Sequence, residues 1–404
     1  MKSLKNWEKS RMVEWKEISS LGEYFGGLTG KSKKDFENGN AKFITYMNVF
    51  SNPSLDVNSV GKVHINEGER QNKVQKGDIL FSGSSETPEE AGMSCVVTED
   101  LEDDYYMNSF CFGLRLNNSE QYNLHYFKHV LRSYSIRQAI SKTASGVTRF
   151  NISKARFGKV QIPIPPIAEQ TRIVSILDTF TDSIENLKQQ IAQRRKQYEY
   201  YRDDLLELKD ITGVILTSLG EVGTFIRGTG IQKADFVDNG FPCIHYGQIH
   251  TKFGISAKET ISLVNEKLYK KSKKASKGDV ILATTSEDAE GVAKPVAWLG
   301  DEDVAISGDA YIFHHEQNGK YMAHLFASHR FFLFKIKHAT GTKVTRISGE
   351  SMAKFELALP DIDLQNRIVA MLDKFEASIS NLEAQLEQRQ KQYEYYRNKL
   401  LTFE

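Results

Sequence analysis

The chain has 404 residues, 40% of them hydrophobic and 26% charged, and a formal net charge of +1. This composition is ordinary for a soluble globular protein with room for two or three domains, and the net charge gives no sign of a nucleic-acid binder. No apolar run reaches the length of a membrane span, and the polar start MKSLKNWEKS lacks a signal-peptide core, so a cytoplasmic location is expected.

A first globular domain is predicted over residues 1–165. Short β-branched and aromatic runs that end at Gly, Asn or Ser predict strands, for example Lys42–Val49. The apolar spacing of Tyr122–Ser141 predicts a helix. Pro165 and its neighbouring prolines mark the point where a strand must stop. These elements indicate a mixed α/β (α+β) domain.

A long central helix is predicted over residues 166–209, with Thr212 and Gly213 closing it. Apolar residues recur in steps of four and three, which is the period of a coiled coil. Such a stripe can also be a simple core face, but a second matching stripe in the same chain favours helix pairing. The residues assigned to pairing in this helix are Ile173, Leu177, Phe180, Ile184, Leu187, Arg194 and Tyr198.

A second globular domain is predicted over residues 210–360 from the same kinds of element. Asp279–Thr284 has the composition of a buried strand, and Lys320–Lys337 has the spacing of a helix. Pro360 ends the domain as the prolines do in the first half. The order along the chain is therefore domain, helix, domain, helix.

The second long helix, predicted over residues 361–404, repeats the first. Gln170–Leu206 reappears as Gln365–Leu401, shifted by 195 residues without a gap and identical at 23 of 37 positions. Asp361 or Asp363 is expected to cap its start. The pairing residues of this copy are Ile368, Leu372, Phe375, Ile379, Leu382, Arg389 and Tyr393.

The arginine that interrupts each stripe bears on the orientation of the helices. A parallel pair in register would bring Arg194 and Arg389 together in a partly desolvated seam. An antiparallel pair would instead place each arginine near Leu382 or Leu187 of the other helix, with its stem on apolar surface and its head in water. We therefore expect an antiparallel coiled coil.

Fainter matches extend the repeat into the two domains. Ile44 and Tyr46 align with Ile244 and Tyr246, and the tripeptide Val-Thr-Arg at 147–149 aligns with 344–346. The chain thus has a pseudo-twofold internal repeat. Well-matched helices suggest that both halves present one surface to the same kind of partner, and divergent domains suggest that each recognises something different.

No catalytic constellation is evident in the sequence, so a non-catalytic protein is expected. The glycine clusters lack the Lys-Ser/Thr pair of a phosphate-binding loop. The three cysteines are scattered, which supports neither a disulfide framework nor a zinc ribbon. The histidines lack metal-ligand spacing, and no metal site is expected. The residues concerned are Cys95, Cys111, Cys243, His314, His315, His324 and His329.

Two equivalent loops favour DNA binding. Residues 145–153 and 340–348 combine glycine, hydroxyl groups and Arg or Lys, which suits close approach to a duplex and contacts with phosphates or base edges. These loops could also merely cap their domains. The candidate base readers are Tyr46, Asn48, Ser84, Ser85, Thr148 and Arg149 in the first domain, and His245, Tyr246, Gln248, Thr285, Ser286, Thr345 and Arg346 in the second. Lys343 is a further DNA-binding candidate in the second loop.

Clustered lysines are candidates for sequence-independent contacts with phosphate. A lysine run is more often a solvated face, so the clusters are weaker evidence than the loops. The candidates are Lys31, Lys33, Lys34, Lys271, Lys273 and Lys274.

The whole chain resembles the specificity subunits of type I restriction-modification systems. The resemblance rests on the duplicated order of domain and helix, on Pro165–Val174 and the looser Pro360–Val369, and on the KQYEYYR blocks at Lys196–Arg202 and Lys391–Arg397. In the second half Asp361–Leu364 departs from the Pro-Ile-Ala-Glu stretch of the first, which leaves open whether both partner sites are equally strong.

The resemblance implies a non-catalytic DNA-specificity subunit with two target-recognition domains. Each domain would read one half of a bipartite site on double-stranded DNA, and the helices would set the spacing and dock two methyltransferase subunits. A restriction subunit would complete the complex. S-adenosylmethionine, ATP and Mg are expected in the partner subunits and none in this chain. A free-standing two-headed DNA-binding regulator and a coiled-coil scaffold that joins proteins are the alternatives.

Overall fold

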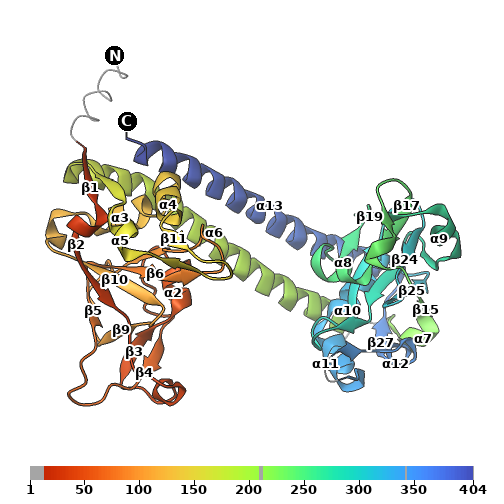
Figure 1. Cartoon of the computed structure of the whole chain (residues 1–404). Coiled ribbons are helices and arrows are strands. Elements are labelled where there is room, and N and C mark those ends of the chain that lie inside the picture. The colour runs from red at the N-terminus through yellow and green to blue at the C-terminus, as the bar shows by residue number, and fades with distance from the viewer. Residues whose placement is uncertain (1–12, 209–212, 342–343, 404) are drawn as a thin grey trace. The chain divides into compact units, whose positions relative to one another are not determined.

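The computed structural model describes residues 13–208, 213–341 and 344–403 (Figure 1). By their contacts the residues form two compact units. The first comprises the chain up to Lys188 together with the segment from Gln385 onward, and the second comprises Gln189–Ala384. Each unit therefore contains one globular domain and a part of both long helices. Thr212 and Lys343 lie outside the described residues.

The first domain is a mixed α/β structure built on two four-stranded sheets. One sheet is antiparallel, in the order β2 (Gly22–Gly26), β10 (Cys111–Leu116), β6 (Asp78–Ser82) and β8 (Ser94–Val96). The other has the order β4 (Gly61–Val63), β3 (Ala41–Ile44), β9 (Tyr105–Met107) and β5 (Lys73–Val74), with β3 and β9 parallel.

Smaller elements complete the first domain. β1 (Glu14–Glu17) pairs with β13 (Gln161–Ile164), and β11 (Ala144–Ser145), β12 (Phe150–Ile152) and β7 (Ser84–Ser85) form a three-stranded sheet. The helices are α2 (Tyr46–Ser51), α3 (Leu124–Val130), α4 (Tyr134–Ser141) and α5 (Lys154–Gly158), with short 3-10 turns at Ile18–Ser20, Lys33–Phe36 and Ser119–Gln121.

The second domain repeats this plan with five strands in each main sheet. The first sheet has the order β15 (Gly223–Arg227), β25 (Ala310–His315), β21 (Val280–Ala283), β23 (Lys294–Trp298) and β18 (Ser256–Ala257). The second sheet has the order β16 (Phe236–Val237), β19 (Ser262–Val264), β17 (Phe241–Ile244), β24 (Val304–Ile306) and β20 (Lys274–Ala275). β14 (Ile215–Ser218) pairs with β27 (Glu356–Leu359), and β22 (Thr285–Ser286) pairs with β26 (Thr345–Arg346). The helices are α7 (Leu219–Val222), α8 (Tyr246–Thr251), α9 (Glu266–Lys271), α10 (Gly319–Ala327), α11 (His329–His338) and α12 (Gly349–Ala353), with a 3-10 turn at Lys233–Asp235.

The predicted strand Lys42–Val49 is a strand only over its first part. β3 ends at Ile44, and α2 begins two residues later. Thr45 lies between them in an extended conformation, and its hydroxyl accepts a hydrogen bond from the backbone nitrogen of Asn48 (3.1 Å). Threonine is a good N-cap because its oxygen satisfies an unpaired amide of the first turn, so the β-branched run contains a helix start.

Each long helix predicted inside a domain is in fact two helices. The first prediction spans α3 and α4, and the second spans α10 and α11. The break is a serine in both cases: the hydroxyl of Ser133 donates to Val130 O (2.7 Å) and that of Ser328 donates to Leu325 O (2.7 Å). A serine hydroxyl can bond a carbonyl that the helix end leaves free, which favours a bend at this position.

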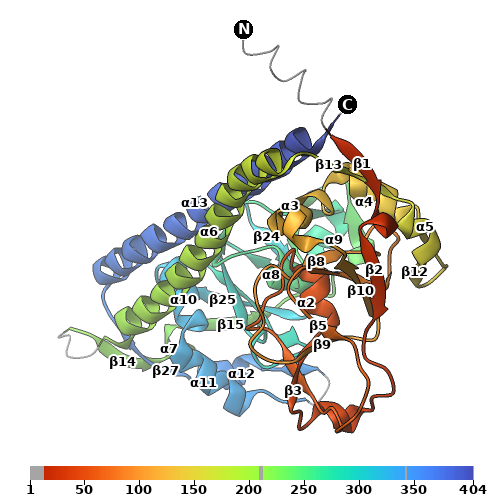
Figure 2. The ribbon, with the colours of Figure 1, turned by 90° about the vertical axis from the view of Figure 1, so that its left-hand side faces the viewer.

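The two long helices are α6 (Ile167–Glu207) and α13 (Ile362–Leu401). Of the two proposed caps, Asp361 is confirmed, because its carboxylate accepts a hydrogen bond from Leu364 N (2.7 Å). In both views the two helices lie side by side within each unit (Figures 1 and 2).

Stacked aromatic rings show that α6 and α13 are antiparallel. Phe180 stacks on Tyr396 in the first unit (5.2 Å between ring centres), and Phe375 stacks on Tyr201 in the second (5.4 Å). Both pairs fit one antiparallel register, which sets Arg389 at the level of Leu187. The guanidinium of Arg389 lies 5.7 Å from the centre of the Phe180 ring. Arg389 is partly exposed and also makes a cation–π contact with this ring.

The ends of the two apolar stripes enter the domain cores. Ile173 and Leu177 of α6 and Leu401 of α13 are buried in the core of the first domain. Ile368 and Leu372 of α13 are buried in the core of the second domain, together with the end of α6. Burying a large aliphatic side chain stabilises a fold by roughly 1.5–3 kcal/mol. Each domain is therefore packed onto the helix pair rather than tethered to it.

Candidate nucleic-acid interface

Three distant segments of the first domain meet beyond the end of β6. Ser84 and Ser85 in β7 pair with Asn151 and Phe150 in β12. The hydroxyl of Tyr46, at the start of α2, donates to Ser84 O (2.7 Å). The turn between β11 and β12 carries the remaining candidates. We call the group the first reading cluster, which consists of Tyr46, Ser84, Ser85, Thr148 and Arg149.

The second domain brings its candidates together in the same way. Thr285 and Ser286 in β22 pair with Arg346 and Thr345 in β26. A ring nitrogen of His250 lies 2.9 Å from Thr285 O. This carbonyl is equivalent to Ser84 O, which accepts the hydrogen bond from Tyr46 in the first domain. The rings of the neighbours His245 and Tyr246 lie 4.6 Å apart. The second reading cluster consists of His245, Tyr246, Thr285, Ser286, Thr345 and Arg346.

The structure corrects the predicted alignment of the two Val-Thr-Arg tripeptides. Ser85 and its equivalent Ser286 pair with Phe150 and Thr345 respectively, so the structural shift between these loops is 195 residues, as in the long helices. Arg149 therefore corresponds to Val344, and Arg346 corresponds to Asn151. The two arginines occupy different places, one in the turn and one in the strand.

Glycines at the start of each turn explain why the tripeptides are out of register. Gly146 and Gly341 have φ values of +156° and +114°, and a Cβ atom there would meet the carbonyl oxygen of Arg149 (1.9 Å) or Val344 (2.0 Å). Only glycine allows such close approach. The glycine and its close contact with a carbonyl three residues later, rather than the tripeptide, are what the two halves share.

Exposure separates the readers from the residues that support them. Thr148, Arg149 and Arg346 are exposed, and Tyr46, Tyr246, Ser286 and Thr345 are partly exposed. The remaining residues are buried, at 6–9% relative exposure, and their contact with bases stays a prediction: Ser84, Ser85, His245 and Thr285. In Ser85, for example, the hydroxyl bonds to Glu90 (3.2 Å). These four residues shape the loops.

Asn48 and Gln248 also hold their own loops together. The buried amide of Asn48 donates to Asp56 O and Ser59 O, both at 2.8 Å, and its oxygen accepts from Asp56 N (3.2 Å). Gln248 accepts from His245 N (3.0 Å) and donates to the hydroxyl of Ser262 (2.7 Å). Their hydrogen-bonding groups are engaged internally, and their role as base readers stays a prediction.

The candidate phosphate-binding lysines divide similarly. Lys31 forms an ion pair with Glu69 (2.6 Å), and this pair lowers the pKa of the Glu69 carboxyl to about 2. The side chain of Lys31 is only 6% exposed. Lys274 lies over the ring of Tyr269 (4.9 Å). The exposed members of the set are Lys33, Lys34, Lys271 and Lys273.

The sequence interpretation missed an exposed aromatic residue beside the first reading cluster. Phe110 is 57% exposed, and the guanidinium of Arg149 lies 5.5 Å from its ring centre. Its backbone oxygen accepts a hydrogen bond from Gly83 N (2.8 Å), which fixes it next to Ser84. Phe110 belongs to none of the sequence motifs considered above. The one sequence feature that could have indicated it is an aromatic residue in a turn directly before a buried strand.

Two matching joints attach the domains to the long helices. In the first unit the buried amide of Gln170 accepts from Asn123 N (3.0 Å) and donates to Pro165 O (2.8 Å). In the second unit the buried Gln365 accepts from Asn318 N (3.0 Å) and donates to Pro360 O (2.9 Å). Each domain is thereby bonded to the start of the helix that follows it.

The other helix contributes a second set of bonds to each joint. In the first unit Asn398 of α13 accepts from Tyr134 N (3.1 Å), and the hydroxyl of Tyr393 lies 3.0 Å from His129. In the second unit Asp203 of α6 accepts from His329 N (3.0 Å), and the hydroxyl of Tyr198 lies 3.1 Å from His324. The tyrosines are members of the repeated KQYEYYR blocks.

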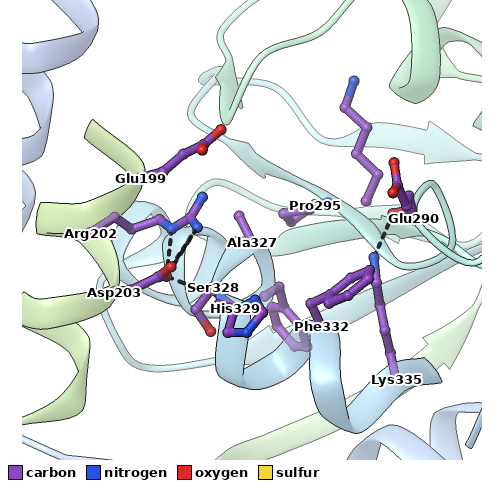
Figure 3. A pocket seen from close by; sticks show the side chains of 12 residues that line it. Glu199, Arg202, Asp203, Glu290, Pro295, Ala327, Ser328, His329, Phe332 and Lys335 are labelled. Atoms are coloured by element: carbon purple, nitrogen blue, oxygen red, sulfur yellow. Dashed lines mark hydrogen bonds and ion pairs between the residues drawn. The ribbon is translucent and has the colours of Figure 1, made fainter. Parts of the chain in front are cut away.

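A cavity of about 460 Å³ lies beside the joint of the second unit (Figure 3). Arg202 and Asp203 of α6 lie on one side of it, and Ser328 and His329 begin α11 on the other. Lys335 donates to the carbonyl oxygens of Glu290 (2.6 Å) and Val292 (2.7 Å), and burial lowers its pKa to about 8. Lys335 thus anchors the loop that follows β22.

Arg137 has the same role in the first domain, where it donates to the carbonyl oxygens of Gly92 (2.6 Å) and Glu89 (2.7 Å). The loop that follows β7 is therefore tied to α4 by Arg137, and the loop that follows β22 is tied to α11 by Lys335. Because each of these helices also begins at a joint, the position of each reading cluster depends on the joint.

Other kinds of site find no support among the residues that the structure describes. No group of three or more His, Cys, Asp or Glu side chains there is arranged to hold a metal ion. Cys95, Cys111 and Cys243 are free and buried, and burial raises the pKa of each thiol to about 12. No helix of the described ranges has the length and apolar character needed to cross a membrane.

Two α/β domains with different reading clusters, seated on one shared antiparallel helix pair, define a two-headed recognition protein. The family model of the type I restriction modification DNA specificity domain matches residues 12–194 and again residues 215–390. The chain therefore belongs to the family of type I restriction-modification specificity subunits. This finding favours the specificity subunit over a free-standing regulator or a scaffold.

Relatives and solved structures agree with this assignment. A protein of Haemophilus influenzae named as a type I restriction enzyme specificity subunit is 27% identical over 71% of this chain and 74% of its own length. A type I restriction enzyme specificity subunit of Escherichia coli is 30% identical over 61% of this chain and 63% of its own length.

Two solved structures share the fold at 15% identity. The first, from a study of the assembly and conformational transition of the type I restriction-modification system, has a TM-score of 0.62 and covers 96% of this chain and 97% of its own. The second is a type I restriction-modification S subunit from M. genitalium, with a TM-score of 0.50 and 96% coverage of both chains.

Proposed function

We propose that this chain is the non-catalytic DNA-recognition subunit of a type I restriction-modification complex, in which each domain reads one half of a bipartite site on double-stranded DNA. The observation that carries the proposal is the pair of equivalent reading clusters with different side chains. Equivalent placement suits two copies of one task, and different side chains suit two different half-sites.

The exposed residues of the clusters have the chemistry that base reading requires. A guanidinium such as that of Arg149 or Arg346 can bind O6 and N7 of a guanine in the major groove with two hydrogen bonds. Exposed hydroxyls in the same turns can donate to phosphates, and Lys33, Lys34, Lys271 and Lys273 add sequence-independent attraction to the backbone. Phosphate contacts would position the domain while the clusters supply specificity.

The helix pair offers a repeated surface for partner subunits. Tyr200 and Tyr201 are 66% and 45% exposed, and their equivalents Tyr395 and Tyr396 are 59% and 40% exposed. In the second unit a groove of about 580 Å³ is lined by Tyr201, Leu205, Met371, Phe375 and three charged residues. Exposed aromatic side chains are typical of interface anchors. We propose that each tyrosine pair docks one methyltransferase subunit.

Catalysis would then belong to the partners. S-adenosylmethionine would be bound by the methyltransferase subunits, and ATP and Mg would serve a restriction subunit. The helix pair would set the distance between the half-sites. This division of labour is supported by the family assignment and by the repeated tyrosine surface.

Mapping of methylated adenines in a host that carries this chain with its methyltransferase subunits tests the proposal. The wild-type complex should modify one bipartite sequence. Arg149→Ala should relax one position of one half-site and leave the other half unchanged, and Arg346→Ala should do the converse. Removal of a two-bond base contact weakens discrimination by about 1–3 kcal/mol. Equal losses at all sequences would reduce both arginines to phosphate contacts and contradict the proposal.

A further inference from the structure

Phe110 and Asp309 occupy the same backbone position in the two domains. The carbonyl oxygen of Phe110 accepts from Gly83 N (2.8 Å), directly before the reading strand β7. The carbonyl oxygen of Asp309 accepts from Thr284 N (3.0 Å), directly before the reading strand β22. Each residue also immediately precedes the equivalent strand, β10 or β25. The backbone is shared, but the side chains have opposite chemistry.

In the first domain this position carries an apolar surface that faces solvent. The Phe110 ring is 57% exposed although it lies beside a well-formed core, and Arg149 covers one part of it at 5.5 Å. An exposed ring next to residues that approach DNA can contact the 5-methyl group of thymine, which an apolar side chain recognises in the major groove. The ring also holds the Arg149 guanidinium beside the same site.

In the second domain the position carries a carboxylate. Asp309 is partly exposed, and its Oδ1 accepts a hydrogen bond from the hydroxyl of Thr285 (3.3 Å) in the second reading cluster. No ion pair within the described part of the chain neutralises it. Burial and the charge of Lys233 lower the pKa of His245 in the same cluster, and the carboxylate of Asp309 acts in the opposite sense.

A carboxylate at a DNA-binding surface is unfavourable unless it meets a donor. The phosphate backbone repels it at every sequence. In the major groove the amino group N4 of cytosine is the donor that Asp and Glu side chains accept from. The remaining acceptor capacity of Asp309 is therefore suited to a cytosine, and its charge disfavours bases that present only acceptors.

We propose that Phe110 and Asp309 are specificity-determining residues, with Phe110 contacting the methyl group of a thymine in one half-site and Asp309 accepting from N4 of a cytosine in the other. The inference rests on the proposed function and names the bases at one position of each half-site. A single position of the fold would thus be used twice, once as an apolar contact and once as a hydrogen-bond acceptor.

The test compares Phe110→Ala and Asp309→Asn in the complete complex. Methylated adenines are mapped in the host, and the purified complex is titrated with duplexes that differ at one base pair. Phe110→Ala should lower the preference for thymine at one position of its half-site roughly 10-fold or more, and Asp309→Asn should do so for cytosine in the other half-site. Each variant should leave the opposite half-site unchanged.

Asp303→Asn is the matched control, because Asp303 is exposed and precedes the start of β24, whereas Asp309 lies beyond the end of that strand. It should keep the wild-type pattern. Unchanged base preference in Phe110→Ala and Asp309→Asn, or a uniform loss at every position of both half-sites, would overturn the inference. A wild-type complex that modifies no bipartite site would instead overturn the proposed function.

Discussion

His324 links the second domain to α6 and is fully buried. Its Nδ1 lies 3.1 Å from the hydroxyl of Tyr198, and its Nε2 has no hydrogen-bond partner within the described residues. Burial, with smaller contributions from Lys320 and Arg202, lowers the pKa of His324 to about 3. The ring is therefore neutral in the folded protein near neutral pH.

This burial predicts a loss of stability in mild acid. In the unfolded chain His324 is protonated below about pH 6.5, whereas in the folded chain it is protonated only below about pH 3. The stabilisation is thus complete above pH 6.5 and falls as the pH drops toward 3, by about 1.4 kcal/mol per pH unit. We expect His324→Gln to show a shallower decline in the free energy of unfolding between pH 7 and 5 in urea titrations.

His338→Gln provides the control for this measurement, because His338 is an exposed histidine at the end of α11. It should retain the wild-type slope. A His324→Gln protein whose stability falls as steeply as that of the wild type would show that the ring is not held neutral by its surroundings.

At the residue scale, the sequence pointed to loop segments but could not give the exposure of their individual side chains. The reading loops were predicted because Gly, hydroxyl and basic residues recur at 145–153 and 340–348. The burial of Asn48 could not be predicted, because a polar residue near a strand looks exposed until the loop of Asp56 and Ser59 folds over it. Phe110 was missed because its role depends on which strand it precedes, and this follows only from the sheet order.

At the scale of elements, the antiparallel pairing of α6 and α13 followed directly from sequence. The four-three spacing fixed the paired faces, and the repulsion between Arg194 and Arg389 fixed the direction. The breaks at Ser133 and Ser328 were not predictable in the same way, because apolar spacing continues across them. Only the local bonds of the two hydroxyls decide that the chain bends there.

The antiparallel pairing predicts that the two seam arginines act independently. Arg389 contacts Phe180 in the first unit, and Arg194 lines a groove with Phe375 in the second. Arg194→Leu and Arg389→Leu should each change the free energy of unfolding by about 1 kcal/mol or less, since a cation–π contact is exchanged for apolar packing. The double variant should equal the sum of the singles in thermal or urea denaturation.

Strong stabilisation of the double variant beyond that sum would mean that the two guanidinium groups repel each other in the wild type. Such a result would favour a parallel pair and contradict the register given by the stacked rings of Phe180 with Tyr396 and of Tyr201 with Phe375.

At the scale of the whole molecule, the helix pair should act as a ruler whose length changes only when both helices change. Removing residues 187–193 and 382–388 deletes one heptad from each helix near the middle of the antiparallel register. Each helix then shortens by about 10 Å, which is about three base-pair rises. Mapping of methylated adenines should show a gap between half-sites shorter by about three base pairs.

Deleting residues 187–193 alone is the matched control, because it moves Tyr198 and Asp203 out of register with α13. We expect this variant to lose thermal stability and modification together. A paired deletion that retains modification with an unchanged gap would rule out the ruler.

The two joints have a consequence for how such chains can diversify. Asn123, His129 and Tyr134 meet the helix pair with the same bonds as Asn318, His324 and His329. Nothing in these bonds distinguishes a first domain from a second. The antiparallel helices form two copies of one socket, and a twofold rotation exchanges these sockets. Exchanging the two domains would therefore keep both reading clusters intact and leave the recognised duplex the same, whereas a new domain in either socket would change one half-site only.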